Sequence, residues 1–338
     1  MLRIRNDAGA NQGLLITYCH VIVEEKNDLQ HVPHPTAWAG QATRPAATNP
    51  WKTRNTGYIP SMPELPEVET VVRDLAAAHI VGRRIHRVEV LHPAILAGSQ
   101  PPEFVRRLTG RTIAAITRRA KFIVFQLDGG EQLALHLRMT GQLHLLRASR
   151  QDKHDHLRLT LDDGRLLTYH DPRRFGRWTL LNNAAEFFAK LGPEPLDNRL
   201  TTPDFAQRLR RHRRQLKPLL LDQTFLAGLG NIYVDEALFA ARLHPRRRAH
   251  TVKPAEACAL LAAIRRILAA AIRARGTTLG LGEGNFAAPH SGRGRFLARL
   301  RAYGRAGKLC SRCGAPIQRM LVGQRGTHFC PTCQRHRR

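Results

Sequence analysis

The stretch Ser61–Thr70 reads SMPELPEVET and begins the part of the chain in which regular patterns appear. Pro66 suits the first turn of a helix, whose N–H groups have no partners within the helix. Glu67 and Glu69 favour the same end, because the N-terminus of a helix carries a partial positive charge. Apolar residues follow at helical spacing: Val68, Val71, Val72 and Leu75. We therefore predict a helix here that Gly82 ends.

The preceding residues 1–61 show no sustained helical or strand period. Prolines are spread through them among Asn, Thr, Ala and Gly residues: Pro33, Pro35, Pro45, Pro50 and Pro60. The short run Leu14–Thr17 is followed by polar sequence, which is not the pattern of a signal peptide. We expect residues 1–61 to be a disordered tail or sequence that is not normally translated.

Short strand-like runs follow the predicted helix, and turn signals at residues 128–130 and 162–164 separate several of them. The runs predicted as strands are Arg84–Leu91, Thr112–Ile116, Phe122–Leu127, Leu133–Leu137, Leu143–Leu146, Leu157–Leu161, Leu166–Tyr169 and Trp178–Leu181. One helix followed by about eight short strands predicts an antiparallel β-sandwich domain.

The sequence becomes helical after residues 191–195, which read LGPEP. The predicted helices are Phe205–Leu209, Leu216–Leu221, Val234–Ala241 and Pro254–Arg273. A glycine-rich turn at Ala227–Asn231 joins the second of these helices to the third. The loop 280–294 is also rich in glycine, and residues 303–338 are expected to form a small terminal module.

Charge is the strongest compositional signal, because 54 Lys and Arg residues against 26 acidic residues give a formal net charge of +28. A surface of this kind suits a polyanion, since each neutralised phosphate releases counterions and adds affinity. A GC-rich genome would explain the use of Arg over Lys but not the excess of bases over acids. We therefore predict a nucleic-acid partner.

The length of 338 residues, of which 43% are hydrophobic, allows two or three ordinary domains with sizeable cores. No apolar run approaches the roughly 20 residues that a membrane helix needs. We therefore expect a soluble intracellular protein.

Four of the six cysteines form a set with metal-ligand spacing. Cys310 and Cys313 make one Cys-x2-Cys pair, and Cys330 and Cys333 make another. This spacing is typical of a tetrahedral zinc site, in which the metal folds a small module and has no open position for catalysis. Disulfides are the alternative, but they suit an intracellular chain with Arg-rich flanks poorly. His328 is interpreted as an ordinary residue of the intervening hairpin.

Eight features occur in order along the chain: MPELPEVET at 62, RRAKF at 118, HLRMTG at 136, KHDH at 153, DPRRFG at 171, LGPEPL at 191, GLGNIYVDEALF at 228 and the four-cysteine module. Together they resemble bacterial formamidopyrimidine-DNA glycosylase, which is also called 8-oxoguanine DNA glycosylase/AP lyase. The match runs from Met62 to about Gln334 and so covers nearly all of the chain except residues 1–61.

The resemblance implies an α+β multidomain protein. Its expected parts are a catalytic domain at residues 62–195 with an N-terminal helix and an antiparallel β-sandwich, a helix-two-turn-helix DNA-binding domain at 196–300, and a Cys₄ zinc-finger module at 301–338. It also implies one structural Zn²⁺ and no organic cofactor. The expected partner is double-stranded DNA with oxidised purines, bound by a monomer that acts at the nucleoid in the bacterial cytoplasm.

Base excision followed by strand cleavage needs a nucleophilic amine at C1′ of the sugar. A secondary amine suits this role, because its attack yields an iminium without the loss of a second N–H proton. Only an N-terminal proline offers such an amine, and its α-amino pKa of roughly 8 leaves a neutral fraction near pH 7. The resemblance assigns this role to Pro63, and it assigns to Glu64 the acid/base role of protonating the ring oxygen. A turn residue at Pro63 and a helix-terminal charge at Glu64 are the alternatives.

The resemblance also assigns contacts with DNA phosphates. Lys121 interrupts an apolar strand and matches a lysine that contacts the phosphate beside the lesion, which makes it part of the catalytic set. A solvent-facing strand residue is the alternative for Lys121. His136 and His154 match further phosphate-contacting positions, although His156 lies close to the second of them.

Met139, Arg173 and Phe175 match the residues with which the family fills the gap left by an extruded base. Methionine supplies a flexible apolar wedge, phenylalanine stacks between bases, and arginine can hydrogen-bond to the orphaned base. Met139 and Phe175 would otherwise be read as core residues. The polar turn DPRRFG argues against that reading, because its aromatic residue lies at the tip.

Four more residues are assigned by the resemblance, and they lie in the second half of the chain. Asn231 follows two glycines, where helix N-terminal amides can face a phosphate, although a helix C-cap is also compatible. Arg325 lies on the predicted zinc hairpin and matches a phosphate-gripping arginine of the catalytic set. Tyr303 matches another backbone contact, and Lys217 a basic position beside the same domain.

Three functions remain open on these residues. The first is excision of oxidised purines with β,δ-elimination, and the second is the sister endonuclease that removes oxidised pyrimidines. Leu65 and the VET run favour the first, because the sister typically has Gly at the position of Leu65. The third is a catalytically silent protein that binds damaged DNA, which follows if residues 1–61 are retained and the Pro63 nitrogen is an amide. We expect Met1 to be a mis-assigned start, with translation from Met62 and removal of that methionine.

Overall fold

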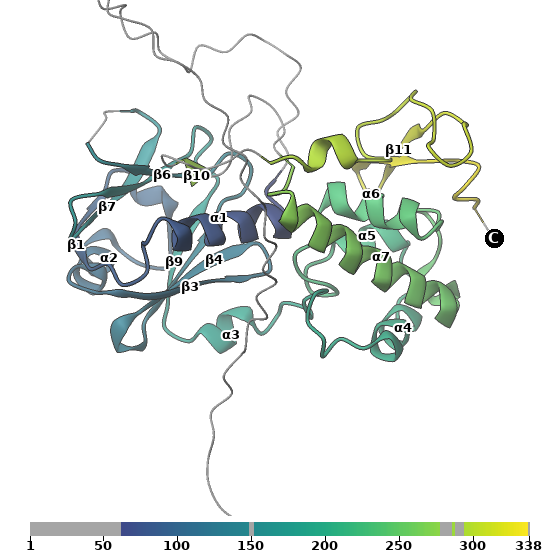
Figure 1. The fold of residues 1–338 in the computed structure, drawn as a ribbon. Helices are drawn as coiled ribbons and strands as arrows, with labels where there is room; N and C mark the ends of the chain where they lie inside the picture. Colours follow the sequence, from purple (N-terminus) through teal and green to yellow (C-terminus); the bar gives the residue numbers. More distant parts are fainter. Residues whose placement is uncertain (1–61, 149–151, 278–285, 288–293, 337–338) are drawn as a thin grey trace, which may run out of the picture. The chain divides into compact units, whose positions relative to one another are not determined.

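The computed structural model describes residues 62–148, 152–277, 286–287 and 294–336 (Figure 1). The expectations for residues 1–61 and for most of the loop 280–294 lie outside these ranges. Within them the chain has the predicted α+β architecture, with an N-terminal helix and a β-sandwich, a helical region and a C-terminal cysteine-rich hairpin.

Helix α1 (Leu65–Ala77) begins inside the stretch that predicts it. The Glu67 carboxylate accepts the N–H of Glu64 at 3.0 Å, which satisfies one of the amides that a helix start leaves without a partner. The side chains at helical spacing are buried in the sandwich core: Val68, Val71, Val72 and Leu75. Leu65 is instead fully buried in the core of the helical region, where a leucine contributes about 2 kcal/mol. α1 therefore contributes to both cores.

Two five-stranded sheets form the sandwich. One sheet has the order β1-β7-β8-β6-β10 and the other β2-β9-β5-β4-β3. Neighbouring strands are antiparallel, except that the two-residue strands β2 and β10 pair in parallel with β9 and β6. The strands are β1 (Ile85–Val90), β2 (Leu96–Ala97), β3 (Ile113–Arg119), β4 (Phe122–Leu127), β5 (Gln132–His136), β6 (Gln142–Leu146), β7 (Asp155–Leu161), β8 (Leu166–His170), β9 (Arg177–Leu181) and β10 (Phe286–Ala287).

Two connections cross from one sheet to the other at the same end of the sandwich. At the ends of β5 and β9, His136 pairs with Arg177. At the ends of β6 and β8, Gln142 pairs with His170. The β5–β6 and β8–β9 connections therefore start and finish at paired residues, and this register brings loops 137–141 and 171–176 next to each other.

Most of the remaining helices surround a second core. They are α4 (Thr202–Arg210), α5 (Leu216–Leu221), α6 (Asn231–Ala240) and α7 (Pro254–Arg273), with short 3₁₀ turns at η3 (Ala249–Thr251) and η4 (Phe296–Arg299). The short helix α3 (Ala184–Phe188) instead contacts Phe122 of β4 through Phe187 and Phe188. α6 is buried on almost every side, and α7 packs against it. The sandwich side carries 3₁₀ turns η1 (Pro93–Ile95) and η2 (Asp128–Gly130), and also α2 (Pro101–Leu108), a helix that the sequence analysis did not predict.

The C-terminal module is an antiparallel hairpin of β11 (Gln318–Val322) and β12 (Arg325–Phe329). Its small core consists of Cys310, Ile317 and Cys330 together with Phe239 of α6 and Ala302. The module is therefore fastened to the helical region through α6. Among the described residues, no helix has the length and apolar character needed to cross a membrane.

Candidate active site and nucleic-acid interface

Glu64 lies at the start of α1, and its carboxylate is bound by the N-terminus of α6. It accepts the N–H groups of Gly230 at 2.7 Å, Ile232 at 2.8 Å and Tyr233 at 3.3 Å. These bonds and nearby Lys121 favour the charged form, but burial outweighs them and raises the pKa of Glu64 to about 7. At neutral pH the carboxyl is therefore present in both its protonated and its ionised form, as an acid/base group requires.

A close approach of the Gly230 backbone to the Glu64 side chain makes this contact possible. A Cβ atom at Gly230 would lie 2.4 Å from the Glu64 side chain, so only glycine fits there. Pro63, the predicted nucleophile, is buried directly before Glu64. The structure thus brings the SMPELPEVET stretch and the GLGN turn together, although they lie far apart in the sequence.

Glu67 supports the same end of α1 from one turn further along. Its Oε1 accepts the Tyr233 hydroxyl at 2.6 Å, the Thr277 N–H at 2.7 Å and the Thr277 hydroxyl at 2.9 Å. Burial raises the pKa of Glu67 against the effect of these bonds. Residues three apart share a helix face, so Glu64 at the N-cap of α1 and Glu67 in its first turn face the helical region together.

Lys121 lies in the turn between β3 and β4, and its side chain is buried. Burial lowers its pKa, whereas the charges of Glu64 and Glu67 act in the opposite direction and that of Arg325 adds to the lowering. In the described part of the chain, no hydrogen bond of its ammonium is found. A buried lysine between two carboxylates and an arginine is placed to receive a further anion.

Glu194 of the LGPEPL segment fixes the turn that carries Lys121. Its carboxylate pairs with Arg118 at 2.6 Å and with Arg119 at 3.2 Å, and it accepts the Ala120 N–H at 2.5 Å. Ala120 has a positive φ of 52°, which is uncommon for a residue other than glycine. The RRAKF and LGPEPL motifs are therefore partners in one clamp.

Arg325 is the first residue of β12, and its side chain is exposed. Two side chains of the helical region bind the next residue, Gly326. Its carbonyl oxygen accepts hydrogen bonds from Lys217 Nζ at 2.9 Å and from Asn231 Nδ2 at 3.1 Å. Asp235 of α6 completes this support by accepting the His328 N–H at 2.8 Å. The helical region thus sets the position of the hairpin end that carries Arg325.

Lys217 does not lie on the surface that the prediction of a DNA contact implies. Its side chain and that of Asp235 are both 0% exposed, and Nζ lies 2.6 Å from Asp235 Oδ1. Burial lowers the pKa of Lys217 against the attraction of Asp235. We interpret Lys217 as a support for the hairpin, because a buried ammonium with two partners has no path to a phosphate.

Asn231 and Tyr303 lie together beside the same hairpin. The Asn231 side chain is within hydrogen-bonding reach of the Tyr303 hydroxyl, and the Tyr303 ring contacts His328 edge-on at 5.2 Å. The backbone of Tyr303 is fixed by Glu236, whose carboxylate accepts its N–H at 2.8 Å. Two of the predicted DNA-binding residues are therefore adjacent in space.

His136 lies at the end of β5, edge-on to Phe122 at 4.8 Å. Burial, followed by the charges of Arg138 and Lys121, lowers the pKa of His136 to about 3. The ring is therefore neutral, and its Nδ1 accepts the Arg138 N–H at 3.0 Å. This assigns the proton to Nε2, which leaves that atom as a hydrogen-bond donor.

The three predicted gap-filling residues lie on the two adjacent loops 137–141 and 171–176. Phe175 is 46% exposed, and the guanidinium of Arg173 lies over its ring at 4.5 Å. Met139 is partly exposed on the neighbouring loop. His154 lies beside them, since its carbonyl accepts the Asp171 N–H at 2.9 Å.

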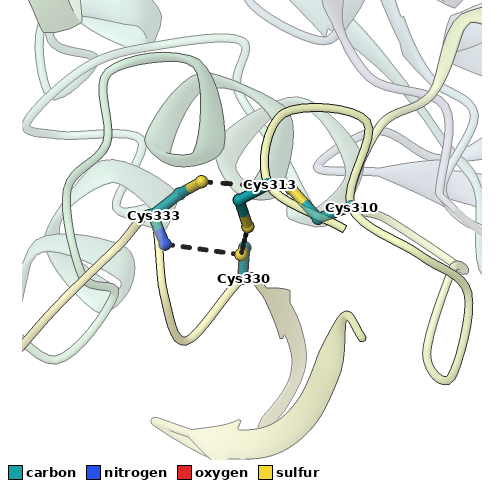
Figure 2. Close-up of side chains that lie close together, drawn as sticks. All are labelled: Cys310, Cys313, Cys330 and Cys333. Carbon is teal, nitrogen blue, oxygen red and sulfur yellow. Dashed lines mark hydrogen bonds between the residues drawn. The ribbon is translucent and has the colours of Figure 1, made fainter. Parts of the chain in front are cut away.

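The four cysteines of the terminal module converge, as Figure 2 shows. The sulfurs of Cys310 and Cys333 lie 4.0 Å apart, and those of Cys313 and Cys330 lie 3.5 Å apart. A tetrahedral ion with Zn–S bonds of about 2.3 Å separates its sulfurs by roughly 3.8 Å, so the arrangement fits zinc. A second group of Asp152, Asp155 and His170 is joined by an Asp155–His170 hydrogen bond of 3.0 Å, and we interpret it as structural.

The sequence analysis missed several supporting residues, and four of them are buried or half-buried acids. They are Asp171, Glu194, Asp235 and Glu236. Asp235 and Glu236 could have been suspected, because they are adjacent in a helix that is otherwise apolar and buried on nearly all sides. Glu194 gave no local signal, because its partners lie more than seventy residues away.

Comparison with known proteins identifies three matching family models. The formamidopyrimidine-DNA glycosylase N-terminal domain matches residues 62–178, and the H2TH domain of the same enzyme matches residues 191–282. The zinc finger found in FPG and IleRS matches residues 307–335. The cysteine cluster is thus a zinc finger, and its four thiolates hold a structural zinc ion.

Curated relatives match over most of the chain. Formamidopyrimidine-DNA glycosylases of Herpetosiphon aurantiacus and Roseiflexus sp. are each 46% identical, over 81% of this chain and 100% of their own length. Two solved structures of Lactococcus lactis Fpg, one with DNA containing N7-benzyl-Fapy-dG and one with abasic-site DNA, are 38% identical with a TM-score of 0.75. Each covers 81% of this chain and 100% of the solved chain.

The order of the three domain models, the level of identity and the fold agree with one another. The predicted fold class and the prediction of an enzyme are confirmed by them. The chain therefore belongs to the formamidopyrimidine-DNA glycosylase family of DNA-binding repair enzymes, which are DNA glycosylases with AP lyase activity.

Proposed function

We propose that this chain excises oxidised purines, namely 8-oxoguanine and formamidopyrimidines, from duplex DNA and then cuts the abasic site by β,δ-elimination. The observation that carries the proposal is the Glu64 carboxyl. It is buried beside Pro63, bound by the N-terminus of α6 and held at a pKa of about 7. A group with that pKa can donate a proton and take it back at neutral pH.

The proposed chemistry begins at the Pro63 nitrogen. Its lone pair forms a bond to C1′ while the bond from C1′ to the base breaks, and the base leaves with the electron pair of that bond. The proton that remains on the Pro63 nitrogen after the attack is transferred to the departing base, which leaves as a neutral molecule. Protonated Glu64 gives its proton to the ring oxygen, so the sugar opens and an iminium joins C1′ to Pro63. Loss of a C2′ proton then expels the 3′-phosphate, and a second elimination expels the 5′-phosphate and leaves a one-nucleotide gap.

Phosphate recognition is assigned to the groups around Glu64. Lys121 is buried between carboxylates without a hydrogen-bond partner in the described residues, and the phosphate beside the lesion would supply its anion. Exposed Arg325 lies close enough to affect the same lysine. His136 offers its Nε2 proton, and Asn231, Tyr303 and His154 offer further contacts along the backbone.

The space of the extruded base is assigned to Met139, Arg173 and Phe175. Their partial or full exposure on adjacent loops supports this role, because a wedge must enter the stacked bases without unfolding the protein. The single active unit is proposed to be a monomer with domains at 62–195, 196–300 and 301–338.

The proposal requires Pro63 to be the first residue of the active protein, since an amide nitrogen cannot attack C1′. The N-terminal family model begins its match at residue 62, which supports this requirement. N-terminal sequencing of the native protein should read Pro-Glu-Leu-Pro-Glu.

Borohydride trapping tests the mechanism, because it reduces the iminium to a stable amine. A protein translated from Met62 should form a covalent complex with an 8-oxoguanine duplex, and the chain that retains residues 1–61 should not. Failure of the Met62 form would refute the Schiff base, and DNA binding without trapping would support the silent-binder alternative. Faster processing of a thymine glycol duplex than of an 8-oxoguanine duplex would support the oxidised-pyrimidine alternative.

A further inference from the structure

The two loops that carry Met139 and the Arg173–Phe175 pair are joined by one buried carboxylate. Asp171 is 0% exposed and begins the 171–176 loop directly after β8. Its Oδ1 accepts the hydroxyl of Thr140, which belongs to the other loop and directly follows Met139. The same oxygen accepts the N–H of Arg173 at 3.2 Å.

The second carboxylate oxygen of Asp171 secures the far end of its own loop. Oδ2 accepts the N–H of Gly176 at 2.9 Å and the hydroxyl of Tyr169 at 3.0 Å. Tyr169 is fully buried, and burial followed by the charge of Asp171 raises its pKa, so the hydroxyl remains a donor. One side chain thus receives donors from β8, from the interior and the end of its own loop, and from the neighbouring loop.

Close packing around the Tyr169 hydroxyl restricts the movement of both loops. A Cβ atom at Gly176 would lie 1.7 Å from the Tyr169 hydroxyl, and one at Gly141 would lie 2.7 Å from it. The tyrosine hydroxyl is therefore enclosed by glycines of both loops. Neither loop can move without disturbing the oxygen that donates to Asp171.

Each loop also holds one arginine in the left-handed backbone region. Arg138 precedes Met139 with φ of 54°, and Arg174 separates Arg173 from Phe175 with φ of 57°. This conformation is energetically unfavourable for any residue that has a side chain. It persists only where the surrounding structure fixes it. The bonds to Asp171 are the surroundings that both loops share.

We propose that Asp171 and Thr140 are positioning residues that couple the Met139 loop to the Arg173–Phe175 loop, so that the three side chains enter the DNA stack as one rigid wedge. This inference rests on the proposed gap-filling role of those three residues. Neither positioning residue touches the reacting atoms. The coupling should therefore matter for removing an intact, stacked base and much less for cutting a sugar that has already lost its base.

The variant that isolates the coupling is Thr140→Val, which keeps the shape of the side chain and removes its hydroxyl donor. The matched control is Thr168→Val on β8. Thr140 is half-buried, whereas the Thr168 hydroxyl is fully buried and has no hydrogen-bond partner among the described residues. The control therefore removes the same atom from the same domain without breaking a bond.

Single-turnover excision from an 8-oxoguanine duplex and cleavage of a preformed abasic site should be measured in parallel. We expect Thr140→Val to slow excision about tenfold and abasic-site cleavage less than about twofold. The fluorescence of 2-aminopurine next to the lesion, which reports local unstacking, should rise less in Thr140→Val than in the wild type. Thr168→Val should match the wild type in all three measurements.

Equal loss of both activities in Thr140→Val would overturn the proposal, because it would indicate a general structural role. Unchanged excision with unchanged fluorescence would also overturn it. Failure of the proposed function itself is distinguishable, because it would appear as a lack of excision and trapping in the wild-type protein.

Discussion

Replacement of Lys217 by methionine tests whether this lysine supports the zinc hairpin or contacts DNA. Lys217 Nζ lies 2.6 Å from Asp235 Oδ1 and 2.9 Å from the Gly326 carbonyl oxygen, and both members of the ion pair are 0% exposed. Methionine has a similar length and no charge, so Asp235 would stay buried without its cation. Removing one partner of a buried pair costs about 3–5 kcal/mol.

For a chain of this size, a loss of that magnitude lowers the midpoint of thermal unfolding by about 10 °C. The matched control is Lys190→Met, because Lys190 is exposed. Loss of a lysine there should change the free energy of unfolding by less than about 0.5 kcal/mol. Calorimetry of the three proteins with zinc bound measures both effects.

The salt dependence of DNA binding then shows whether Lys217 supports the hairpin or contacts DNA. Each phosphate contact contributes about 0.9 to the slope of log affinity against log salt concentration. Arg325→Gln should lower that slope by about one contact, whereas Lys217→Met should weaken binding with little change in slope. A Lys217→Met protein that unfolds like the wild type and loses about 0.9 from the slope would refute our interpretation of Lys217.

Three further predictions follow from the site. Folding raises the pKa of Glu64 from 4.5 to about 7, so its contribution to stability is complete below pH 4.5 and is lost as the pH rises through 7. Denaturant unfolding should therefore show that the free energy of unfolding of the wild type falls by about 3 kcal/mol relative to that of Glu64→Gln between pH 4.5 and about pH 8. A difference between the two proteins that does not change with pH would contradict the burial of this carboxyl. Chelation should remove zinc, expose the amides of residues 318–329 to hydrogen exchange and abolish DNA binding; binding retained after verified zinc loss would contradict the role of the finger. Glu194→Gln should release the turn that carries Lys121 and slow excision about tenfold at unchanged zinc content. Excision at the wild-type rate in this variant would rule out a positioning role of Glu194.

Much of the secondary structure could be predicted from local patterns. The bounds of β4 (Phe122–Leu127), α5 (Leu216–Leu221) and α7 (Pro254–Arg273) are those predicted, because their apolar spacing and their end signals lie within the elements themselves. α2 (Pro101–Leu108) was missed, since it buries only Phe104 and Leu108 and gives too short a pattern. Strands β2 and β10 have two residues each and exist only through pairing with a neighbour.

The candidate site could be predicted as a set of residues but not as a set of contacts. Resemblance assigned Glu64 and Arg325, and their assigned chemistry stays a prediction. Lys217 was expected at the DNA surface, and the structure buries it because Asp235 lies one element away on α6. The clamp of Glu194 and the tie between Asp171 and Thr140 were not foreseen, because their partners are distant in sequence.

Features whose cause is local can be read from the amino-acid sequence alone. Proline and glutamates start α1, two Cys-x2-Cys pairs supply four thiolates to one zinc ion, and the excess of basic residues makes the chain a partner for DNA. Which groups lose contact with water, and which charges meet, depends on long-range packing. The pKa of Glu64 depends on its burial against α6, and the wedge loops meet through strand register. Desolvation and packing act between residues that the chain separates by tens to hundreds of positions, so no local pattern encodes them.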